Sequence, residues 1–362
     1  MSPAFEESTE TIELEALHSW LRSRIPAAEE LELSALRRPG AGESSDTQLF
    51  EARWCEAGER RVLPGVLRCA PRKPGPFPSY DLAMQFEIMQ SLGKRSPVPV
   101  PEVIWLEEDP SALGAPFLVM RQIEGDAPLD FPSYQGEGMY RDAAPETRAQ
   151  IWRSTVEAVA TLHAQDWRKL GLTRVPGARA GDDPARQQLD TWRDYLDWIR
   201  EEPGERLAVF DEALVWLESS QPPSGPLSLC WGDAKLGNVL YRPGARNVAA
   251  LLDWEMATIG DPEMDLASLH LSDLRAQDGS GGGALEGTPG AEELIRMYEK
   301  ASGRSVRDFH RALVFSTFWR GAVQIKVMRQ MRARGTEIPD ALFVDNFPVR
   351  TLCRLLSLPR PG

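Results

Sequence analysis

Residues 230–255 read CWGDAKLGNVLYRPGARNVAALLDWE. Three polar side chains in this stretch have a spacing that indicates a function. Asp233 is followed five residues later by Asn238, and Asp253 comes fifteen residues after that. Phosphoryl transfer from a nucleotide needs one carboxylate to orient and deprotonate the attacking hydroxyl. It also needs an amide oxygen and a second carboxylate to hold magnesium. Kinase-type loops have the spacing Asp-x-x-x-x-Asn, followed by a separate metal-binding Asp. The pattern predicts Asp233 as the catalytic base and Asn238 and Asp253 as magnesium ligands.

The surrounding sequence predicts a hairpin that brings the two metal ligands together. Residues 238–241 and 248–252 are short apolar runs of strand type, and Pro243-Gly244 between them is a strong turn signal. Such a hairpin sets Asp253, at the end of its second strand, beside Asn238, at the start of its first. The alternative is that these polar residues are ordinary turn and strand-end residues, because Asp and Asn are common there.

With these residues in place, the chain resembles the aminoglycoside phosphotransferase-like kinases, which share the protein-kinase-like fold with choline and fructosamine kinases. The usual loop of that family reads His-Gly-Asp-x-x-x-x-Asn, and Trp231 stands here in place of the His. That change concerns the packing of the loop rather than its chemistry. Residues 260–267, GDPEMDLA, resemble the family's second signature. The resemblance implies that Asp265 braces the catalytic loop. The alternative is that Asp265 only favours the first turn of a helix.

The resemblance implies an α+β, protein-kinase-like fold with two lobes. The small antiparallel-sheet lobe, which binds the nucleotide, would span residues 1–124, and the larger, mainly helical lobe, with the catalytic and substrate-binding groups, residues 125–362. Hydrophobic periodicity predicts for the first lobe helices over 9–25 and 81–93 and strands over 31–36, 48–54, 61–68, 102–107 and 117–123. For the second lobe it predicts helices over 145–162, 186–200, 205–218, 261–271, 291–301, 306–332 and 340–356. Asp261 is the expected N-cap of its helix, and the Gly-rich residues 278–290 are expected to be mobile.

Three residues are expected to contact the phosphates of the nucleotide, and a fourth, Glu87, to hold one of them. The turn at 37–46 carries Ser44 and Ser45, and backbone N–H groups and hydroxyls in such a turn can bind phosphate, although most Gly/Ser turns are only turns. Arg68 occupies the third-strand position where kinases carry a phosphate-pairing Lys. It keeps the charge, but its planar fork is not interchangeable with an ammonium. The resemblance makes Glu87 the ion-pair partner of Arg68; the alternative is a solvated helix Glu.

Two residues are expected to lie at the adenine. Residues 117–123 resemble the strand and hinge that link the nucleotide lobe to the larger lobe, so backbone groups near Met120 and Gln122 would meet the adenine edge. Met120 fits a core position equally well, because Met is a usual gap filler.

His163 lies beside an apolar helical stripe, and we interpret it as a packed, hydrogen-bonded core residue.

Composition argues against several other classes of protein. The 362 residues include 41 basic and 54 acidic side chains, a net charge of −13, whereas general nucleic-acid binding needs a basic face. No apolar run approaches the roughly 20 residues of a membrane span, and the acidic N-terminus lacks the features of a signal peptide. The four cysteines are scattered, so neither a disulfide framework nor a zinc site is indicated. These features predict a cytoplasmic protein with reduced thiols and leave the oligomeric state open.

The sequence thus predicts a small-molecule kinase that binds ATP, or GTP, with magnesium and phosphorylates a hydroxyl group. Lys235, near Asp233, stands where many protein kinases have a Lys on the transferred phosphate; the alternative is a solvent-facing loop residue. Enzymes of this architecture act on aminoglycosides, choline and sugars. Domains similar to those fused to acyl-CoA dehydrogenases act on hydroxyacyl thioesters. The loop at 231–233, Arg68 and residues 253–255 resemble that last group more than they resemble dedicated resistance enzymes.

Two other functions compete with this prediction. A nucleotide-binding pseudokinase with a regulatory role would fit Arg68 and Trp231, but a pure binder need not keep the base and both metal ligands. A protein kinase fits less well, because the chain lacks a Gly-x-Gly-x-x-Gly loop and the Asp-Phe-Gly triplet.

Overall fold

The structure is a computed structural model of the chain. It describes residues 14–39, 46–72, 75–179, 181, 183–202, 208–220, 225–244 and 246–360. Backbone contacts divide the chain into two units. The first unit comprises residues 1–73 and 102–122, and the second comprises residues 74–101 and 123–362. The helix predicted over 81–93 therefore groups with the second unit. The lobe boundary at 124/125 stays a prediction.

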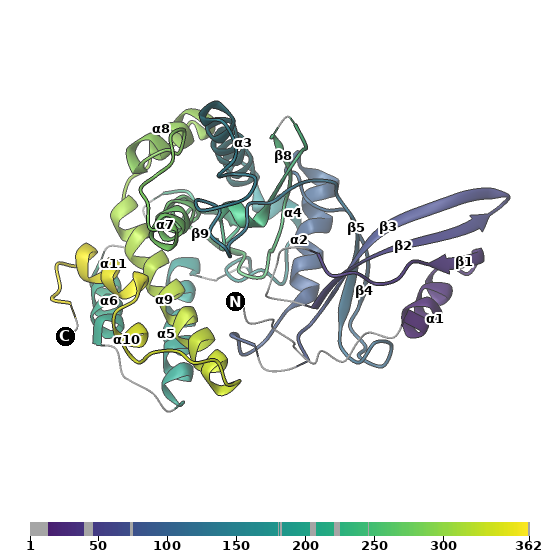
Figure 1. Cartoon of the computed structure of the whole chain (residues 1–362), viewed down its shortest axis with the longest axis horizontal. Coiled ribbons are helices and arrows are strands. Elements are labelled where there is room, and N and C mark those ends of the chain that lie inside the picture. The colour runs from purple at the N-terminus through teal and green to yellow at the C-terminus, as the bar shows by residue number, and fades with distance from the viewer. Residues whose placement is uncertain are drawn as a thin grey trace. The chain divides into compact units, whose positions relative to one another are not determined.

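The first unit is built on a five-stranded antiparallel sheet with the order β1-β2-β3-β5-β4 (Figure 1). Its strands are β1 (Glu29–Leu33), β2 (Asp46–Glu56), β3 (Glu59–Cys69), β4 (Val103–Glu107) and β5 (Phe117–Arg121). The predicted meander of the first three strands is confirmed. Ala57 and Gly58 turn the chain between β2 and β3 with φ of 49° and 80°, as a two-residue hairpin turn that matches strand twist requires.

Helix α1 (Leu14–Arg24) completes the first unit by packing its apolar face on the sheet. Leu17, Trp20 and Leu21 are buried, and the Trp20 ring meets Phe117 of β5 edge-on, with 4.7 Å between centroids. The predicted α+β class is confirmed by this sheet together with the helical second unit.

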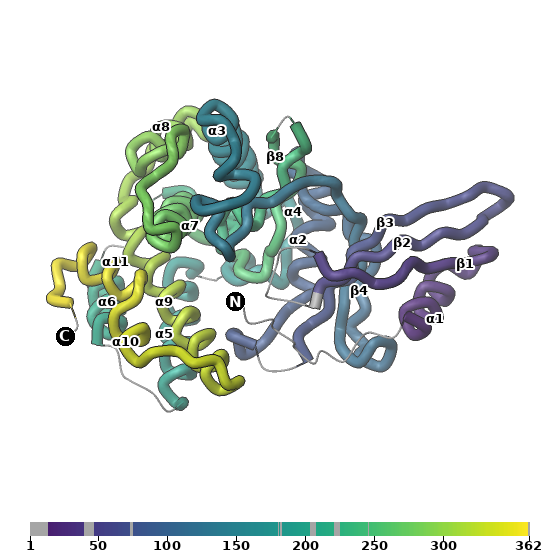
Figure 2. Tube along the Cα trace, in the orientation of Figure 1, coloured from purple at the N-terminus to yellow at the C-terminus, as the bar shows by residue number. Residues whose placement is uncertain are grey.

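The second unit is mainly helical. Its helices are α2 (Leu82–Arg95), α3 (Pro145–His163), α4 (Trp167–Leu170), α5 (Pro184–Arg200), α6 (Ala208–Ser219), α7 (Glu263–Ser280), α8 (Ala291–Ser302), α9 (Phe309–Ala333), α10 (Ala341–Val344) and α11 (Phe347–Leu355), with a 3₁₀ turn η1 (Leu236–Asn238). Two small antiparallel sheets pair β6 (Ser228–Cys230) with β9 (Thr258–Gly260) and β7 (Val239–Tyr241) with β8 (Val248–Leu251). The trace in Figure 2 shows α7 beside α9 and α3 beside α8.

The core of the second unit lies among α5, α6, α9 and α11. Trp192 of α5 stacks on Trp319 of α9 with 5.2 Å between ring centroids, and Tyr195 is buried beside them. Trp192 and Tyr195 therefore pack in this core. None of the helices in the described ranges combines the length and the apolar character that crossing a membrane demands.

Three predicted elements differ from the structure. The helix predicted over 340–356 is two helices, α10 and α11. The first ends at Val344 with Asp345 as its C-cap, and Asn346 caps the second, accepting a hydrogen bond from Val349 N at 3.1 Å. Helix α7 begins at Glu263 rather than at 261, with Asp261 Oδ1 accepting from Glu263 N. It continues to Ser280, so the predicted loop at 278–290 begins later. The three-residue strands β6 and β9 were not predicted at all.

Candidate functional site

The hairpin of β7 and β8 places the predicted metal ligands side by side. Val239 pairs with Leu251 across the hairpin, and Leu252 N donates a hydrogen bond to the carbonyl oxygen of Asn238 at 2.9 Å. Asp253 follows directly, with its backbone in the left-handed region at φ 61°. Asp tolerates that region better than most residues, and such conformations concentrate at functional sites. The predicted juxtaposition of Asn238 and Asp253 along the backbone is therefore confirmed.

Asn238 also holds the predicted base. Its Nδ2 donates to Asp233 Oδ2 at 3.0 Å and to the carbonyl oxygen of Asp233 at 3.0 Å. With the amide nitrogen directed to Asp233, Oδ1 of Asn238 is the atom left for a cation. A carboxylate and an amide oxygen are the hard oxygen donors that Mg²⁺ prefers, so the donor set of Asn238 and Asp253 fits magnesium.

Asp233 lies in a cluster of charges. Its Oδ2 is 3.3 Å from Lys235 Nζ, and its Oδ1 is 2.7 Å from Arg320 Nη2. Burial alone would raise the pKa of Asp233, but the charges of Lys235 and Arg320, with the hydrogen bond from Asn238, hold that pKa well below its usual range. Asp233 is therefore a carboxylate at neutral pH, as a group that accepts the proton of a hydroxyl must be.

Lys235 forms ion pairs. The alternative interpretation of Lys235 as a solvent-facing loop residue is therefore wrong. Besides Asp233, its Nζ contacts Asp130 Oδ2 at 2.7 Å, and the Lys235 side chain is 22% exposed. Burial alone would lower the pKa of Lys235, but the carboxylates of Asp233 and Asp130 raise it above its ordinary value. Contact of Lys235 with a transferred phosphate stays a prediction. Asp130 was not singled out from the sequence, because it lies in a loop more than a hundred residues upstream with no motif around it.

Arg320 is the second residue of the cluster that sequence reasoning missed. It lies on α9, within the helix predicted over 306–332, among several other basic residues. Its Nη2 also donates to Ser268 Oγ on α7, and its guanidinium carbon lies 4.6 Å from the centroid of the Trp319 ring. Nothing in the local sequence distinguishes Arg320 from its neighbours; only the packing of α9 on α7 brings it to Asp233.

Asp265 braces the loop that carries Asp233. Its fully buried carboxylate accepts hydrogen bonds from Trp231 N at 2.6 Å and Gly232 N at 2.8 Å. It also lies 3.0 Å from Nε2 of His163, whose Nδ1 is 2.9 Å from the hydroxyl of Tyr298. The role implied for Asp265 is confirmed, and so is the interpretation of His163 as a hydrogen-bonded core residue.

Trp231 replaces the usual His without disturbing this loop. The side chain is fully buried, and its indole Nε1 donates to the carbonyl oxygen of Leu252 at 2.7 Å. The next residue, Gly232, has a φ of 89°, and a Cβ there would lie 2.0 Å from the carbonyl oxygen of Met256. Trp231 therefore ties the loop of the base to the strand end that precedes Asp253, and only glycine fits at 232.

His163, Cys230 and Asp265 are buried close together, and we interpret them as structural residues of the catalytic loop's surroundings rather than as a metal site. The possible ligand atoms of His163, Cys230 and Asp265 lie within 4.8 Å of one another. Burial and the nearby Asp265 raise the pKa of the Cys230 thiol, which opposes the thiolate that a metal needs. The Asp265 carboxylate is already used by the two loop N–H groups.

The residues expected to bind the nucleotide do not form a cluster like the one around Asp233 within the described residues. Ser44 and Ser45 lie outside the described residues. Arg68 on β3 is buried and lies opposite Leu118 of β5. Met120 on β5 is buried, and Gln122 N donates to the carbonyl oxygen of Pro64 at 2.8 Å. The roles of Arg68, Met120 and Gln122 toward a nucleotide stay predictions.

Glu87, on α2 of the second unit, has well-defined partners there. Its two carboxylate oxygens accept hydrogen bonds from Thr173 N, Thr173 Oγ1 and Arg174 N at 2.6–3.0 Å. Glu87 is thus not simply a solvated helix residue. The expected ion pair with Arg68 would join the two units and stays a prediction.

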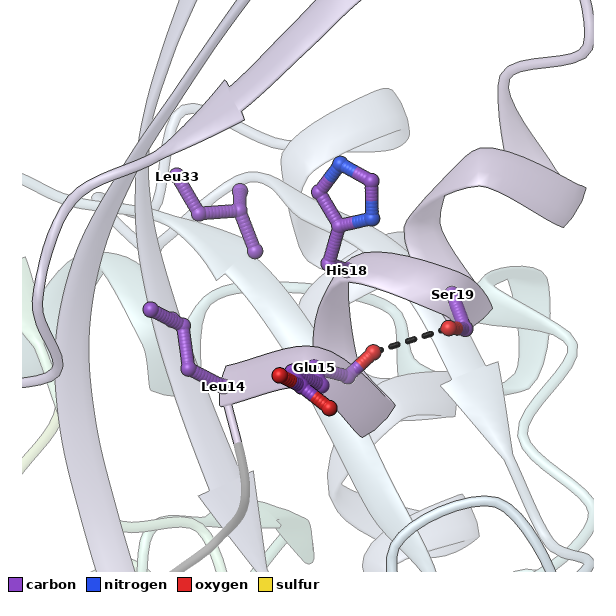
Figure 3. A pocket seen from close by; sticks show the side chains of 5 residues that line it. All are labelled: Leu14, Glu15, His18, Ser19 and Leu33. Atoms are coloured by element: carbon purple, nitrogen blue, oxygen red, sulfur yellow. Dashed lines mark hydrogen bonds between the residues drawn. The ribbon is translucent and has the colours of Figure 1, made fainter.

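A separate hollow of about 440 Å³ lies in the first unit and contains none of the predicted site residues (Figure 3). It is lined by Leu14, Glu15, His18, Ser19 and Leu33. Ser19 Oγ donates to the carbonyl oxygen of Glu15 at 2.8 Å, the dashed line in Figure 3, and His18 Nε2 lies 2.9 Å from the carbonyl oxygen of Leu31. Its polar groups are used within the fold, and we assign it no function.

Comparison with known proteins agrees with the fold. The model of the phosphotransferase enzyme family, APH, matches residues 36–313. Together, the sheet-and-helix architecture and the family match define a phosphotransferase of protein-kinase-like fold. The chain belongs to the phosphotransferase enzyme family.

Solved structures share this fold. A candidate aminoglycoside phosphotransferase from Ralstonia eutropha superposes with a TM-score of 0.64 over 95% of each chain, at 22% identity. A thermostable mutant of aminoglycoside phosphotransferase APH(4)-Ia, in a ternary complex with ADP and hygromycin B, gives a TM-score of 0.57 over 94% of this chain and 98% of that chain, at 15% identity. At such identities the likeness extends to the fold alone.

Curated relatives are much longer proteins. The chain is 29% identical over 281 residues to probable acyl-CoA dehydrogenase IBR3 of Arabidopsis thaliana, covering 73% of this chain and 32% of that protein. It is 30% identical over 232 residues to acyl-CoA dehydrogenase family member 11 of Rattus norvegicus, covering 62% and 28%. The matched region is thus about a third or less of the length of these relatives.

Proposed function

We propose that the protein transfers the terminal phosphoryl group of ATP, or of GTP, to a hydroxyl of a small molecule. The observation that carries this proposal is the cluster formed by Asp233, Asn238 and Asp253. Asn238 is hydrogen-bonded to Asp233 through its side chain and to Leu252, next to Asp253, through its backbone. This arrangement supports the roles proposed here, Asp233 as the base and Asn238 and Asp253 as the oxygen ligands of Mg²⁺, which phosphoryl transfer requires in one place.

In this reaction the acceptor oxygen forms a bond to the terminal phosphorus while the bond from that phosphorus to the bridging oxygen breaks. The proton of the acceptor hydroxyl passes to the Asp233 carboxylate, and the nucleoside diphosphate leaves. Magnesium, when bound to Asn238 Oδ1 and Asp253, would supply charge neutralisation for the phosphates. Lys235 would supply a further positive charge for the transferred group. The chain's own contribution is mainly positioning and charge stabilisation.

The acceptor is the least defined part of the proposal. Hygromycin B is bound to one protein of the same fold, and another is named as a choline/ethanolamine kinase family protein from Mesorhizobium loti. The longer relatives are named as acyl-CoA dehydrogenases. We therefore propose an aminoglycoside-like or hydroxyacyl-type acceptor and give the hydroxyacyl class priority, because the sequence matches to those relatives have the higher identity. A cytoplasmic location, where ATP is available, remains part of the proposal.

A nucleotide-binding pseudokinase is the second candidate. Two observations favour it: Arg68 stands in place of the usual Lys, and Glu87 is already occupied by the backbone of residues 173–174. Magnesium-dependent turnover of ATP would separate the two candidates, because a binder that has lost catalysis would bind ATP without consuming it.

The proposed function can be tested by measuring magnesium-dependent phosphate transfer from labelled ATP to aminoglycosides, choline, sugars and hydroxyacyl thioesters. Wild type should label one class of acceptor, and Asp233→Asn should abolish that transfer. Asp278→Asn, which changes a half-exposed carboxylate on α7 paired with Arg350, serves as the matched control and should keep it. Transfer that survives in Asp233→Asn would contradict the assignment of the base, and ATP binding without transfer would favour the pseudokinase.

A further inference from the structure

The two oxygens of the Asp233 carboxylate are occupied unequally. Oδ2 faces two donors, Asn238 Nδ2 and Lys235 Nζ, whereas Oδ1 faces one donor among the described residues, Arg320 Nη2. Each carboxylate oxygen offers about two lone-pair directions. Oδ2 is therefore filled, and Oδ1 keeps a direction for a further hydrogen. An acceptor hydroxyl that donates to Asp233 would bind at Oδ1, beside Arg320.

Arg320 is fixed in position at this point. Nη2 is shared between Asp233 Oδ1 and Ser268 Oγ, and the guanidinium lies against the face of Trp319, 4.6 Å from its centroid. The side chain is 17% exposed. A planar guanidinium held by an ion pair, a hydroxyl and an aromatic face has little freedom to move away when an acceptor binds.

Part of the guanidinium makes no contact within the described part of the chain. Of the five N–H donors of an arginine, the contacts within the described part of the chain use those of Nη2 only, and Nε is buried with no hydrogen-bond partner there. Buried donors are normally satisfied. Atoms next to the reacting hydroxyl would thus meet a fixed cation whose Nη1 donors are unused in the described part of the chain, while Asp130, another carboxylate of the cluster, is paired with Lys235.

We propose that Arg320 determines which acceptors the enzyme takes: it favours molecules with a carbonyl, hydroxyl or anionic oxygen next to the reacting hydroxyl, and disfavours those with an ammonium there. An oxygen accepts hydrogen bonds from the unused Nη1 donors, whereas an ammonium would add a like charge beside Arg320. The inference rests on the proposed function, because it concerns the acceptor of that same phosphoryl transfer.

The test compares matched acceptors that differ mainly in this neighbouring group. One pair is glucose and glucosamine, and the other is 3-hydroxybutanoate and 4-amino-2-butanol. The ratio of kcat/KM within each pair is measured for wild type, Arg320→Gln, Arg320→Lys and the control Arg311→Gln. The control removes another buried arginine of α9, which bonds to Ser220 rather than to Asp233.

Wild type should prefer the oxygen-bearing member of the pair it accepts. Arg320→Gln should lower that preference by about tenfold or more, the effect of one charged hydrogen bond, and Arg320→Lys should give an intermediate ratio, whereas Arg311→Gln should leave it unchanged. A preference of wild type for the ammonium member, or an unchanged ratio in Arg320→Gln, would overturn the inference alone. Transfer by wild type to no acceptor at all would contradict the proposed function and the inference with it. If Arg320→Gln does not fold, the ratio in Arg320→Lys decides.

Discussion

At the scale of single residues, the site depends on a carboxylate that is only 16% exposed and lies between two cations. Asp233 contacts Lys235, Arg320 and Asn238 within 3.3 Å. Because each partner stabilises the charged form, the base is also part of the framework of the site. Removing a partner should therefore change stability as well as activity.

The pH dependence of that stability follows from the two pKa shifts. The pKa of Asp233 is lowered in the folded protein. Its contribution to the free energy of unfolding is therefore complete above its pKa in the unfolded chain, about 4, and is lost as the pH falls through its folded-state pKa. The pKa of Lys235 is raised, so its contribution is complete below about 10.4 and is lost only as the pH rises through a still higher folded value. The difference in unfolding free energy between wild type and Lys235→Met should thus be constant from roughly pH 5 to pH 9. Urea titrations across that range would check this, and a difference that fades near neutral pH would contradict the pairing.

Asp265 should matter to the loop rather than to the reaction itself. Asp265→Asn leaves one acceptor oxygen where two N–H groups and His163 now bind, and should cost about 1–3 kcal/mol of unfolding free energy, together with most of the activity. Asp278→Asn on the same helix, α7, removes only an exposed ion pair and should change stability by less than about 1 kcal/mol. Equal effects of the two variants in denaturant unfolding would argue against the brace.

The residues of the site differ in how far the sequence could predict them. Asp233, Asn238 and Asp253 were predictable because a short loop and a hairpin fix their relation through local spacing. Arg320 and Asp130 were not, because each reaches the site through tertiary packing of a distant segment. A single arginine on a helix with several basic residues carries no local signal of that kind.

At the scale of elements, the loop and hairpin are built around one glycine. A Cβ at Gly232 would lie 2.0 Å from the carbonyl oxygen of Met256, at a φ of 89°. Gly232→Ala should therefore displace the loop and abolish activity, with a loss of several kcal/mol in stability. Gly244→Ala in the β7–β8 turn is the matched control: its φ is 77°, but a Cβ there meets nothing within 4 Å, so it should cost only about 1–2 kcal/mol of conformational strain. Similar unfolding free energies for the two variants would contradict the steric argument.

Element boundaries show what hydrophobic patterns resolve and what they miss. The long strands β2 and β3 and the long helices were predictable from their periodicity. The strands β6 and β9 have three residues each, too few for a period to be recognised. The break between α10 and α11 had a signal, Asn346 followed by Pro348, which is the pattern of a helix start; the continuous apolar face concealed it.

At the scale of the whole molecule, a bound nucleotide should raise the stability of the folded protein against thermal unfolding. A ligand that binds only the folded protein adds about 2.7 kcal/mol at a concentration one hundred times its Kd. ATP with magnesium should thus raise the Tm of wild type, and Asp253→Asn should lose the part of the increase that depends on magnesium. Thermal unfolding with and without magnesium would measure this, using a non-hydrolysable ATP analogue. The same magnesium-dependent increase in Asp253→Asn would contradict the assignment of that ligand.

The backbone of Asp253 also limits how this site can be lost during evolution. At a φ of 61°, asparagine and glycine are the replacements that the chain accepts most readily, and each is one base change away from an aspartate codon. Both would remove the negative ligand while leaving the hairpin intact. Under the proposed function, a descendant that drifts in this way would remain folded while losing catalysis, which gives this chain a short route from an enzyme to a binding protein.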